Sequence, residues 1–134
     1  MKMVYPSSGD KDFEDLRHDN KFLEAFTYAW GMVESDIEQK IIYEFGLNPN
    51  SEMYEIKVKY LLGQFSKNVA FLHKIKKIND TQNDVFVDFS DKRNKLFHGT
   101  RGKNYDKLIL DFTEAKKKEY LDTASLALRT TTYG

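Results

Sequence analysis

The residues best suited to chemistry lie in one short stretch of this 134-residue chain, between Arg93 and His98. Histidine can exchange protons near neutral pH, and arginine offers a rigid fork of donors to phosphate or carboxylate oxygens. At about 100° per residue on a helix, Asp91, Asn94 and His98 follow one polar line. This combination predicts an anion site with a proton donor or acceptor beside it.

Arg93 also interrupts the apolar face of the helix that must carry it. That helix is expected from about Asp84 to Phe97, and most of its apolar residues fall on one side. The residues of this face are Val85, Phe86, Phe89, Leu96 and Phe97. A guanidinium in the middle of such a face is costly unless it is paired or borders a cleft or a partner chain. Because local inconsistency often marks a functional site, Arg93 is a candidate site residue.

A structural explanation of the same residues stays open. Arg93 could pair with a carboxylate of the acidic first helix, such as Glu24 or Glu34. His98 could be a helix C-terminal histidine that the helix dipole favours. In that case the segment stabilises the fold and performs no reaction.

A long first helix should precede this segment. Residues 1 to about 11 have the composition of a loose lead-in, with Asp10 or Asp12 as the helix cap. Apolar residues then recur at steps of three and four, which indicates one helical stripe. The stripe consists of Phe22, Phe26, Trp30, Val33, Ile37 and Ile41. The helix should end near Gly46, and Trp30 should be the centre of the core.

A second helix should open near Ser51 and keep its helical spacing to Ile75. It is expected to form an antiparallel hairpin with the first. A polar loop follows at residues 79–84, and its last residue caps the third helix. Gly99 and Gly102 should end that third helix.

The end of the chain predicts one more helix. Residues 99–111 look irregular, and Asp111 with Glu114 resembles a capping box for the last helix. Residues 130–134 are expected to fray, like the lead-in. The chain should therefore be a single all-α domain over residues 1–134, an up-down bundle of about four to five helices.

Composition narrows the classes of function. The chain has no cysteine, so it can form neither a disulfide nor a thiolate metal site. His18 and His73 lack a second ligand at metal spacing, and the 7 glycines form no phosphate loop, so we expect no metal and no other cofactor. The start of the chain lacks the apolar run of a signal peptide, and no apolar stretch could span a bilayer. We therefore expect a cytoplasmic protein with no membrane contact.

The charges are unevenly distributed along the chain, although the formal net charge is zero. The segment from Asp10 to Glu55 has 12 acidic and 4 basic residues, and the segment from Lys92 to Lys118 has 9 basic and 3 acidic residues. This asymmetry predicts one acidic and one basic surface, with anions as partners of the basic segment. Solvated helix faces that differ in sign would produce the same pattern.

The sequence Arg93-Asn94-Lys95-Leu96-Phe97-His98 resembles the R-x4-H motif of the HEPN domain family, in which a polar residue follows the arginine. HEPN domains are small helical bundles, and their motif lies at the end of a helix that follows a long helical hairpin. The same order of helices is expected here. The resemblance covers six residues as a motif and most of the chain in helix order, and it implies a HEPN-like bundle.

The resemblance also implies a metal-independent endoribonuclease that acts as a homodimer. A two-fold axis would place Arg93 and His98 of both chains around one phosphate of the RNA. His98 would assist attack of the ribose 2′-hydroxyl or protonate the leaving 5′-oxygen, and Arg93 would stabilise the charge on the phosphorane. Asn94 would orient the phosphate or the histidine, and the products would carry 2′,3′-cyclic phosphate ends. The residues that would hold the RNA backbone by charge are Lys92, Lys95, Arg101 and Lys103.

A biological setting follows from the same resemblance: prokaryotic defence, a stress response or a toxin-antitoxin pair with a nucleotidyltransferase-type antitoxin. HEPN toxins of such pairs often carry a tyrosine two residues after the histidine, where this chain has Thr100. Regulation by modification of that tyrosine is therefore not expected. Two other functions remain as alternatives: a catalytically silent HEPN domain that binds nucleotide or RNA, and a helical protein-interaction module.

Overall fold

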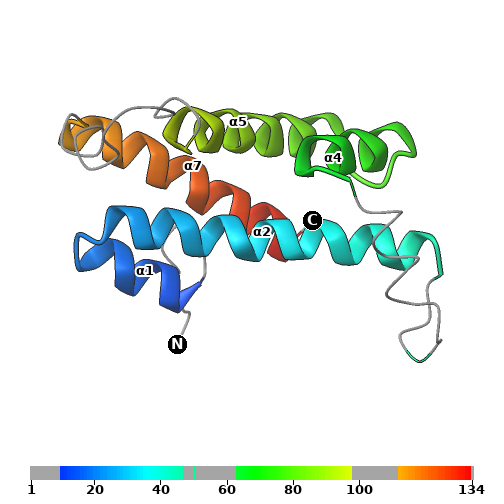
Figure 1. Ribbon diagram of the computed structural model, residues 1–134, viewed down its shortest axis with the longest axis horizontal. Helices are drawn as coiled ribbons and strands as arrows, with labels where there is room; N and C mark the ends of the chain where they lie inside the picture. Colours follow the sequence, from blue (N-terminus) through cyan, green and yellow to red (C-terminus); the bar gives the residue numbers. More distant parts are fainter. Residues whose placement is uncertain (1–9, 47–49, 51–62, 98–111, 134) are drawn as a thin grey trace, which may run out of the picture.

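The computed structural model describes residues 10–46, 50, 63–97 and 112–133. These ranges contain five helices and no strand, which confirms the prediction of an all-helical bundle (Figure 1). The helices are α1 (Lys11–His18), α2 (Phe22–Glu44), α4 (Phe65–Lys74), α5 (Asp80–Phe97) and α7 (Glu114–Tyr133). None of them is long and apolar enough to cross a membrane.

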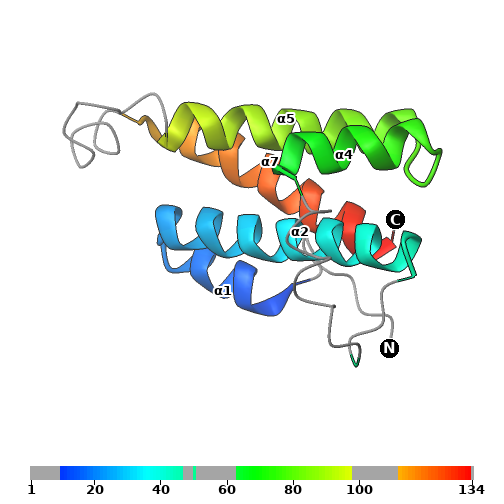
Figure 2. The ribbon, with the colours of Figure 1, turned by 45° about the vertical axis from the view of Figure 1, so that its right-hand side comes forward.

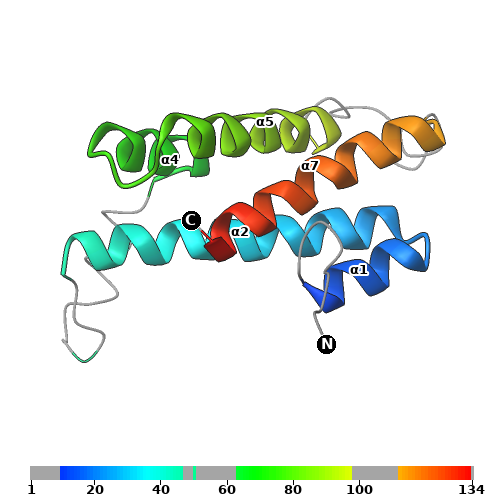
Figure 3. The same ribbon diagram turned by 180° about the vertical axis from the view of Figure 1, so that it is seen from behind.

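Helix α7 connects two pairs of helices. Helices α1 and α2 form one pair, α4 and α5 form the other, and α7 packs obliquely against both α2 and α5 (Figures 1 and 3). Helix α4 also contacts α2. The site segment therefore lies on a helix that is supported from two sides.

Helix α4 runs in the same direction as α2, and α5 runs in the opposite direction, packed against α4 and α7 (Figure 2). Two ring pairs fix this direction: Phe65 lies against Trp30 with ring centroids 4.6 Å apart, and Phe71 stacks on Phe45 at 5.5 Å. The predicted antiparallel hairpin of the first two long helices is therefore wrong for the described part of α4. The antiparallel partner of α4 is α5, because a short turn connects these two helices.

The expected long first helix is two helices, and this corrects the sequence prediction. Helix α1 ends at His18, and Asn20 adopts a left-handed backbone with a φ of 59°. Asparagine tolerates this conformation, and the N–H of Lys21 closes the turn by donating to the carbonyl of Leu16 at 3.0 Å. Helix α1 folds back on α2 and buries Phe13 completely. The periodic stripe begins only after this turn.

The N-cap of α1 is Asp10, which is one of the two residues that the sequence predicted for this role. Its carboxylate accepts the backbone N–H of Phe13 at 3.0 Å and also the hydroxyl of Tyr28 on α2 at 3.1 Å. The side chain of Asp10 therefore starts α1 and connects it to α2.

The predicted end of the long helix is also confirmed, because α2 ends at Glu44 and Gly46 follows with a left-handed φ of 62°.

Helix α5 starts four residues before the predicted position. Asn79 and Gln82 cap it reciprocally: the Asn79 side chain accepts the Gln82 N–H, and the Gln82 side chain accepts the Asn79 N–H, both at 2.8 Å. The polar residues that predicted a loop thus form the first turn of the helix. The turn before it includes Lys76, whose φ is 63°.

Helix α7 starts after Thr113, whose hydroxyl accepts the N–H of Lys116 at 3.0 Å. Thr113 is therefore the cap that the sequence prediction assigned to Asp111. The helix continues to Tyr133, although fraying was predicted from residue 130. The predicted helix start at Ser51, the stops at Gly99 and Gly102 and the irregular segment 99–111 lie outside the described residues.

The core lies between α2, α5 and α7. Phe26 and Phe89 are fully buried and meet edge to face at 5.2 Å, and Tyr120 of α7 packs on Phe26 at 6.0 Å. Trp30 is only partly buried and packs against the edge of this core, so the prediction that Trp30 is its centre is wrong. This edge position places the indole beside the candidate site.

Candidate functional site

Arg93 lies on the inner side of α5, where the sequence predicted it, and aromatic rings surround it. Its guanidinium carbon is 4.9 Å from the centroid of the Trp30 ring and 5.3 Å from that of Phe97, and its Nε atom is buried. Trp30 comes from α2, and Phe97 is one turn further along α5. Contacts between a cation and ring faces offset part of the cost of moving a charge out of water. The fold therefore accommodates Arg93 at the edge of the core and holds its fork in one place.

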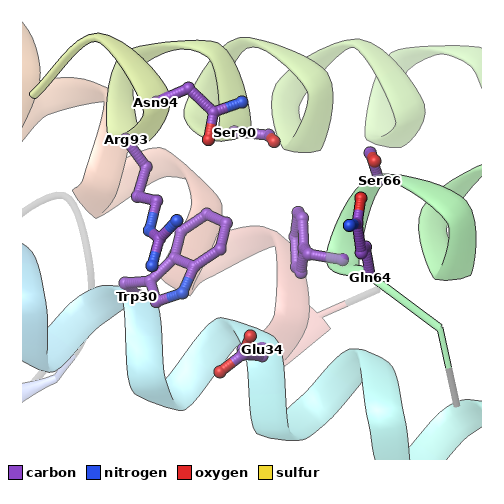
Figure 4. A pocket seen from close by; sticks show the side chains of 8 residues that line it. Trp30, Glu34, Gln64, Ser66, Ser90, Arg93 and Asn94 are labelled. Atoms are coloured by element: carbon purple, nitrogen blue, oxygen red, sulfur yellow. The ribbon is translucent and has the colours of Figure 1, made fainter. Parts of the chain in front are cut away.

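A pocket of about 560 Å³ opens where α2, α4 and α5 meet. Its lining residues are Trp30, Glu34, Gln64, Phe65, Ser66, Ser90, Arg93 and Asn94. In Figure 4, Arg93 and Asn94 reach in from α5, Glu34 comes from α2 on the opposite side, and Gln64 and Ser66 come from the start of α4. Three helices that are separate in the sequence thus contribute polar groups to one concave space, as is usual for ligand sites.

Both signs of charge are present in this pocket. Arg93 supplies a guanidinium and Glu34 a carboxylate, and the other polar groups are hydroxyls and amides. Glu38 lies one turn further along α2. Its pKa is raised, mainly because the carboxyl group is partly buried and secondly because the charge of Glu34 is close to it. The pocket can therefore bind an anionic group near Arg93 and a hydrogen-bond donor near Glu34.

Two of the predicted catalytic residues line the pocket together. These are Arg93, which is half-buried, and Asn94, which is exposed. Ser90, one turn before Asn94 on α5, is buried and lines the pocket too. The third predicted catalytic residue, His98, follows the last residue of α5 and lies outside the described residues, as do Arg101 and Lys103.

The predicted RNA-binding lysines on α5 differ in their surroundings. Lys92 pairs with Asp88 of its own helix, with 2.8 Å between Nζ and the carboxylate, and it contacts α7, where Glu119 is 3.9 Å and the ring centroid of Tyr120 is 5.9 Å from Nζ. The side chain of Lys92 is only 14% exposed, so its charge is compensated and partly covered. Lys95 is exposed and remains the better candidate for a contact with RNA.

Sequence reasoning missed the contribution of α4. Gln64 and Ser66 reach the pocket only because α4 runs along α2, and no local pattern could indicate this pairing. Glu34 was considered only as an ion-pair partner of Arg93, and Trp30 only as a core residue. Their spacing of four on α2 places both on one helix face, which was the available signal.

The described part of the chain contains no group of three or more His, Cys, Asp or Glu side chains that could hold a metal ion. His73 is engaged with Asp80, with 2.7 Å between Nε2 and the carboxylate, and His18 is exposed in the last turn of α1. No protein-family model, no curated protein and no solved structure matches this chain.

Proposed function

We propose that this protein is a metal-independent endoribonuclease of the HEPN type that acts as a homodimer in prokaryotic defence, a stress response or a toxin-antitoxin system. One observation carries the proposal. Arg93 is held against Trp30 and Phe97 at the wall of a polar pocket, five residues before His98 in the sequence. A cation in this position is preorganised for a phosphate oxygen.

The proposed reaction uses residue types that suit it without a metal ion. The ribose 2′-oxygen forms a bond to phosphorus and loses its proton, and the bond from phosphorus to the 5′-oxygen breaks as that oxygen gains a proton. His98 transfers one or both of these protons, since its side chain exchanges protons near neutral pH. Arg93 stabilises the negative charge on the phosphorane, and Asn94 orients the phosphate. The products carry 2′,3′-cyclic phosphate and 5′-hydroxyl ends.

Basic residues near the Arg93 to His98 segment in the sequence would hold the RNA backbone. Lys95, Arg101 and Lys103 are the proposed contacts, whereas Lys92 contributes less because Asp88 and Glu119 compensate its charge. A dimer would bring two copies of the Arg93 to His98 segment to one phosphate.

The test is RNA cleavage by the purified protein in excess EDTA. We expect cleavage with 2′,3′-cyclic phosphate ends, and no cleavage by His98→Ala at an unchanged melting temperature. Glu24→Gln, an exposed change on α2, is the control and should cut like the wild type. Intact cleavage by His98→Ala, or no cleavage of several RNA substrates by the wild type, would contradict the proposal.

The composition of the pocket favours a second function, a catalytically silent domain that binds nucleotide or RNA. An indole, a guanidinium and two carboxamides can bind a nucleotide without any acid or base. Binding of RNA without cleavage by the wild type would support this function. A third function, a helical interaction module, predicts neither binding nor cleavage.

A further inference from the structure

The carboxylate of Glu34 has no role in the proposed phosphate chemistry, although it shares the pocket with Arg93. A carboxylate repels a phosphate and accepts hydrogen bonds only. In Figure 4 it lies on the α2 side of the pocket, across from Asn94 and Ser90 on α5. This side of the pocket is therefore suited to a part of a ligand that donates hydrogen bonds.

The pocket also has an aromatic wall. Trp30 and Phe65 both line it, and their ring centroids are 4.6 Å apart at an interplanar angle of 51°. Nucleobases that are unstacked from single-stranded RNA bind against such side chains and present their edges to polar groups. An aromatic wall next to a carboxylate and an arginine matches the parts of a nucleotide: base, base edge and phosphate.

We infer that this pocket binds the guanine base of the nucleotide whose 3′-phosphate is cleaved, and that Glu34 determines this preference. The inference rests on the proposed ribonuclease function and names the base that the site selects. Guanine presents two adjacent donors, N1–H and the N2 amino group, which match the two oxygens of a carboxylate.

The other bases fit a carboxylate less well. Adenine and cytosine present an amino group beside a ring nitrogen that accepts hydrogen bonds, and uracil presents one N–H between two carbonyl oxygens. In each case an acceptor faces the carboxylate and weakens the contact. The carboxamide of Gln64 and the hydroxyl of Ser66 can donate to O6 and N7 of guanine.

Trp30 provides a direct readout of binding, because it is the only tryptophan of the chain and lines the pocket. The experiment titrates the His98→Ala protein with the 3′-monophosphates of guanosine, adenosine, cytidine and uridine, and with inorganic phosphate, and follows the emission of Trp30. We expect guanosine 3′-monophosphate to bind at least about tenfold more tightly than the other four ligands. Equal binding of all nucleotides, a response to phosphate equal to that to the guanosine ligand, or no response at all would overturn the inference.

Glu34→Gln tests the residue itself. We expect this change to weaken binding of the guanosine ligand by about tenfold or more and to leave the other nucleotides within about twofold, since one of the two acceptor oxygens becomes a donor. Glu24→Gln is the matched control on the same helix, because Glu24 is exposed and does not line the pocket. A guanine preference that survives Glu34→Gln would contradict the role of Glu34.

The two proposals fail in different ways. If RNA is cleaved equally after all four bases, the guanine site is wrong and the ribonuclease stands. If guanosine 3′-monophosphate binds selectively and no RNA is cleaved, the pocket stands and the ribonuclease is wrong.

Discussion

At the scale of single residues, Arg93 combines a stability role with its proposed catalytic one. Its guanidinium is close to two ring faces, and such contacts stabilise a protein by about 0.5 to 1 kcal/mol each at partly exposed sites. The same contacts restrict the side chain, so that its donors are fixed before a ligand arrives. A substitution must therefore be judged by both readouts.

Arg93→Ala should lower the free energy of unfolding by about 1 to 2 kcal/mol, from the loss of two ring contacts, and should abolish RNA cleavage. Arg93→Lys keeps the charge but loses the planar fork, so it should recover part of the stability and little of the activity. Urea unfolding and a cleavage assay measure the two effects. Lys95→Ala, exposed on the same helix, is the control for stability. Wild-type cleavage by Arg93→Ala with a much larger loss of stability would identify Arg93 as purely structural.

Tyr28 predicts a loss of stability at high pH. The pKa of Tyr28 is raised from 10.0 to about 12, mainly by burial and secondly by the hydrogen bond that its hydroxyl donates to Asp10. The folded protein then holds a proton that the unfolded chain has lost, so stability falls as the pH rises from about 10 to about 12. In Tyr28→Phe this fall should be smaller. Urea unfolding at several pH values measures it, and Tyr43→Phe is the control because Tyr43 is 82% exposed. Identical pH profiles for wild type and Tyr28→Phe would refute the prediction.

The residue pattern predicted which positions on α5 face inward, and with them the unusual place of Arg93. Helical periodicity is enough for this, because Phe86, Phe89 and Leu96 recur at helical spacing, lie on the same side of α5 and are all buried. The partner of Arg93 could not be predicted in the same way. An ion pair with Glu24 or Glu34 was one open possibility, and nothing in the pattern indicated the ring of Trp30, which the packing of α2 on α5 places beside the guanidinium.

At the scale of helices, the sequence correctly predicted that the described segments are helical. It failed to separate α1 from α2, placed the start of α5 too late and gave α4 the wrong direction relative to α2. Periodicity cannot detect a short turn between two helices that both keep the apolar pattern, which is why α1 and α2 were joined. A stretch of polar residues can equally be a loop or the capped first turn of a helix. For this reason the start of α5 was predicted too late in the sequence. The direction of α4 relative to α2 depends on the connection between them and has no local signal.

The first turn of α5 offers a prediction at this scale. Asn79→Ala should lower the free energy of unfolding by about 1 kcal/mol, because the N–H of Gln82 loses its acceptor. Asn83→Ala is the matched control inside the same helix and should leave stability unchanged or slightly higher, since alanine is the better helix former. Thermal unfolding followed by circular dichroism measures both. Equal melting temperatures for Asn79→Ala and Asn83→Ala would argue against this cap.

At the scale of the whole molecule, the pocket depends on packing between helices that are distant in the sequence. Phe65 reaches Trp30, and Arg93 reaches the same indole from α5. The sequence could supply Arg93 and Asn94 for the candidate site, since both lie on one helix. It could not supply Gln64 and Ser66, because only the tertiary arrangement brings the start of α4 to this place.

The proposed homodimer can be tested by mixing chains. If one phosphate is held by two copies of the Arg93 to His98 segment, an inactive chain should lower the activity of the wild-type chain with which it pairs. With about a nine-fold excess of His98→Ala, about nine in ten wild-type chains enter mixed dimers, so activity should fall about tenfold by mass action.

RNA must be in excess over both proteins, so that binding of substrate to the inactive chain does not cause the fall. An equal amount of the doubly substituted protein Arg93→Ala and His98→Ala should lower the activity at least as much, because this chain contributes neither the charge nor the proton transfer to a shared site. Activity that depends only on the amount of wild-type protein, whatever is added, would show that each chain works alone. In that case the two-fold arrangement would be wrong, and a single Arg93 to His98 segment would have to supply both the charge and the proton transfer.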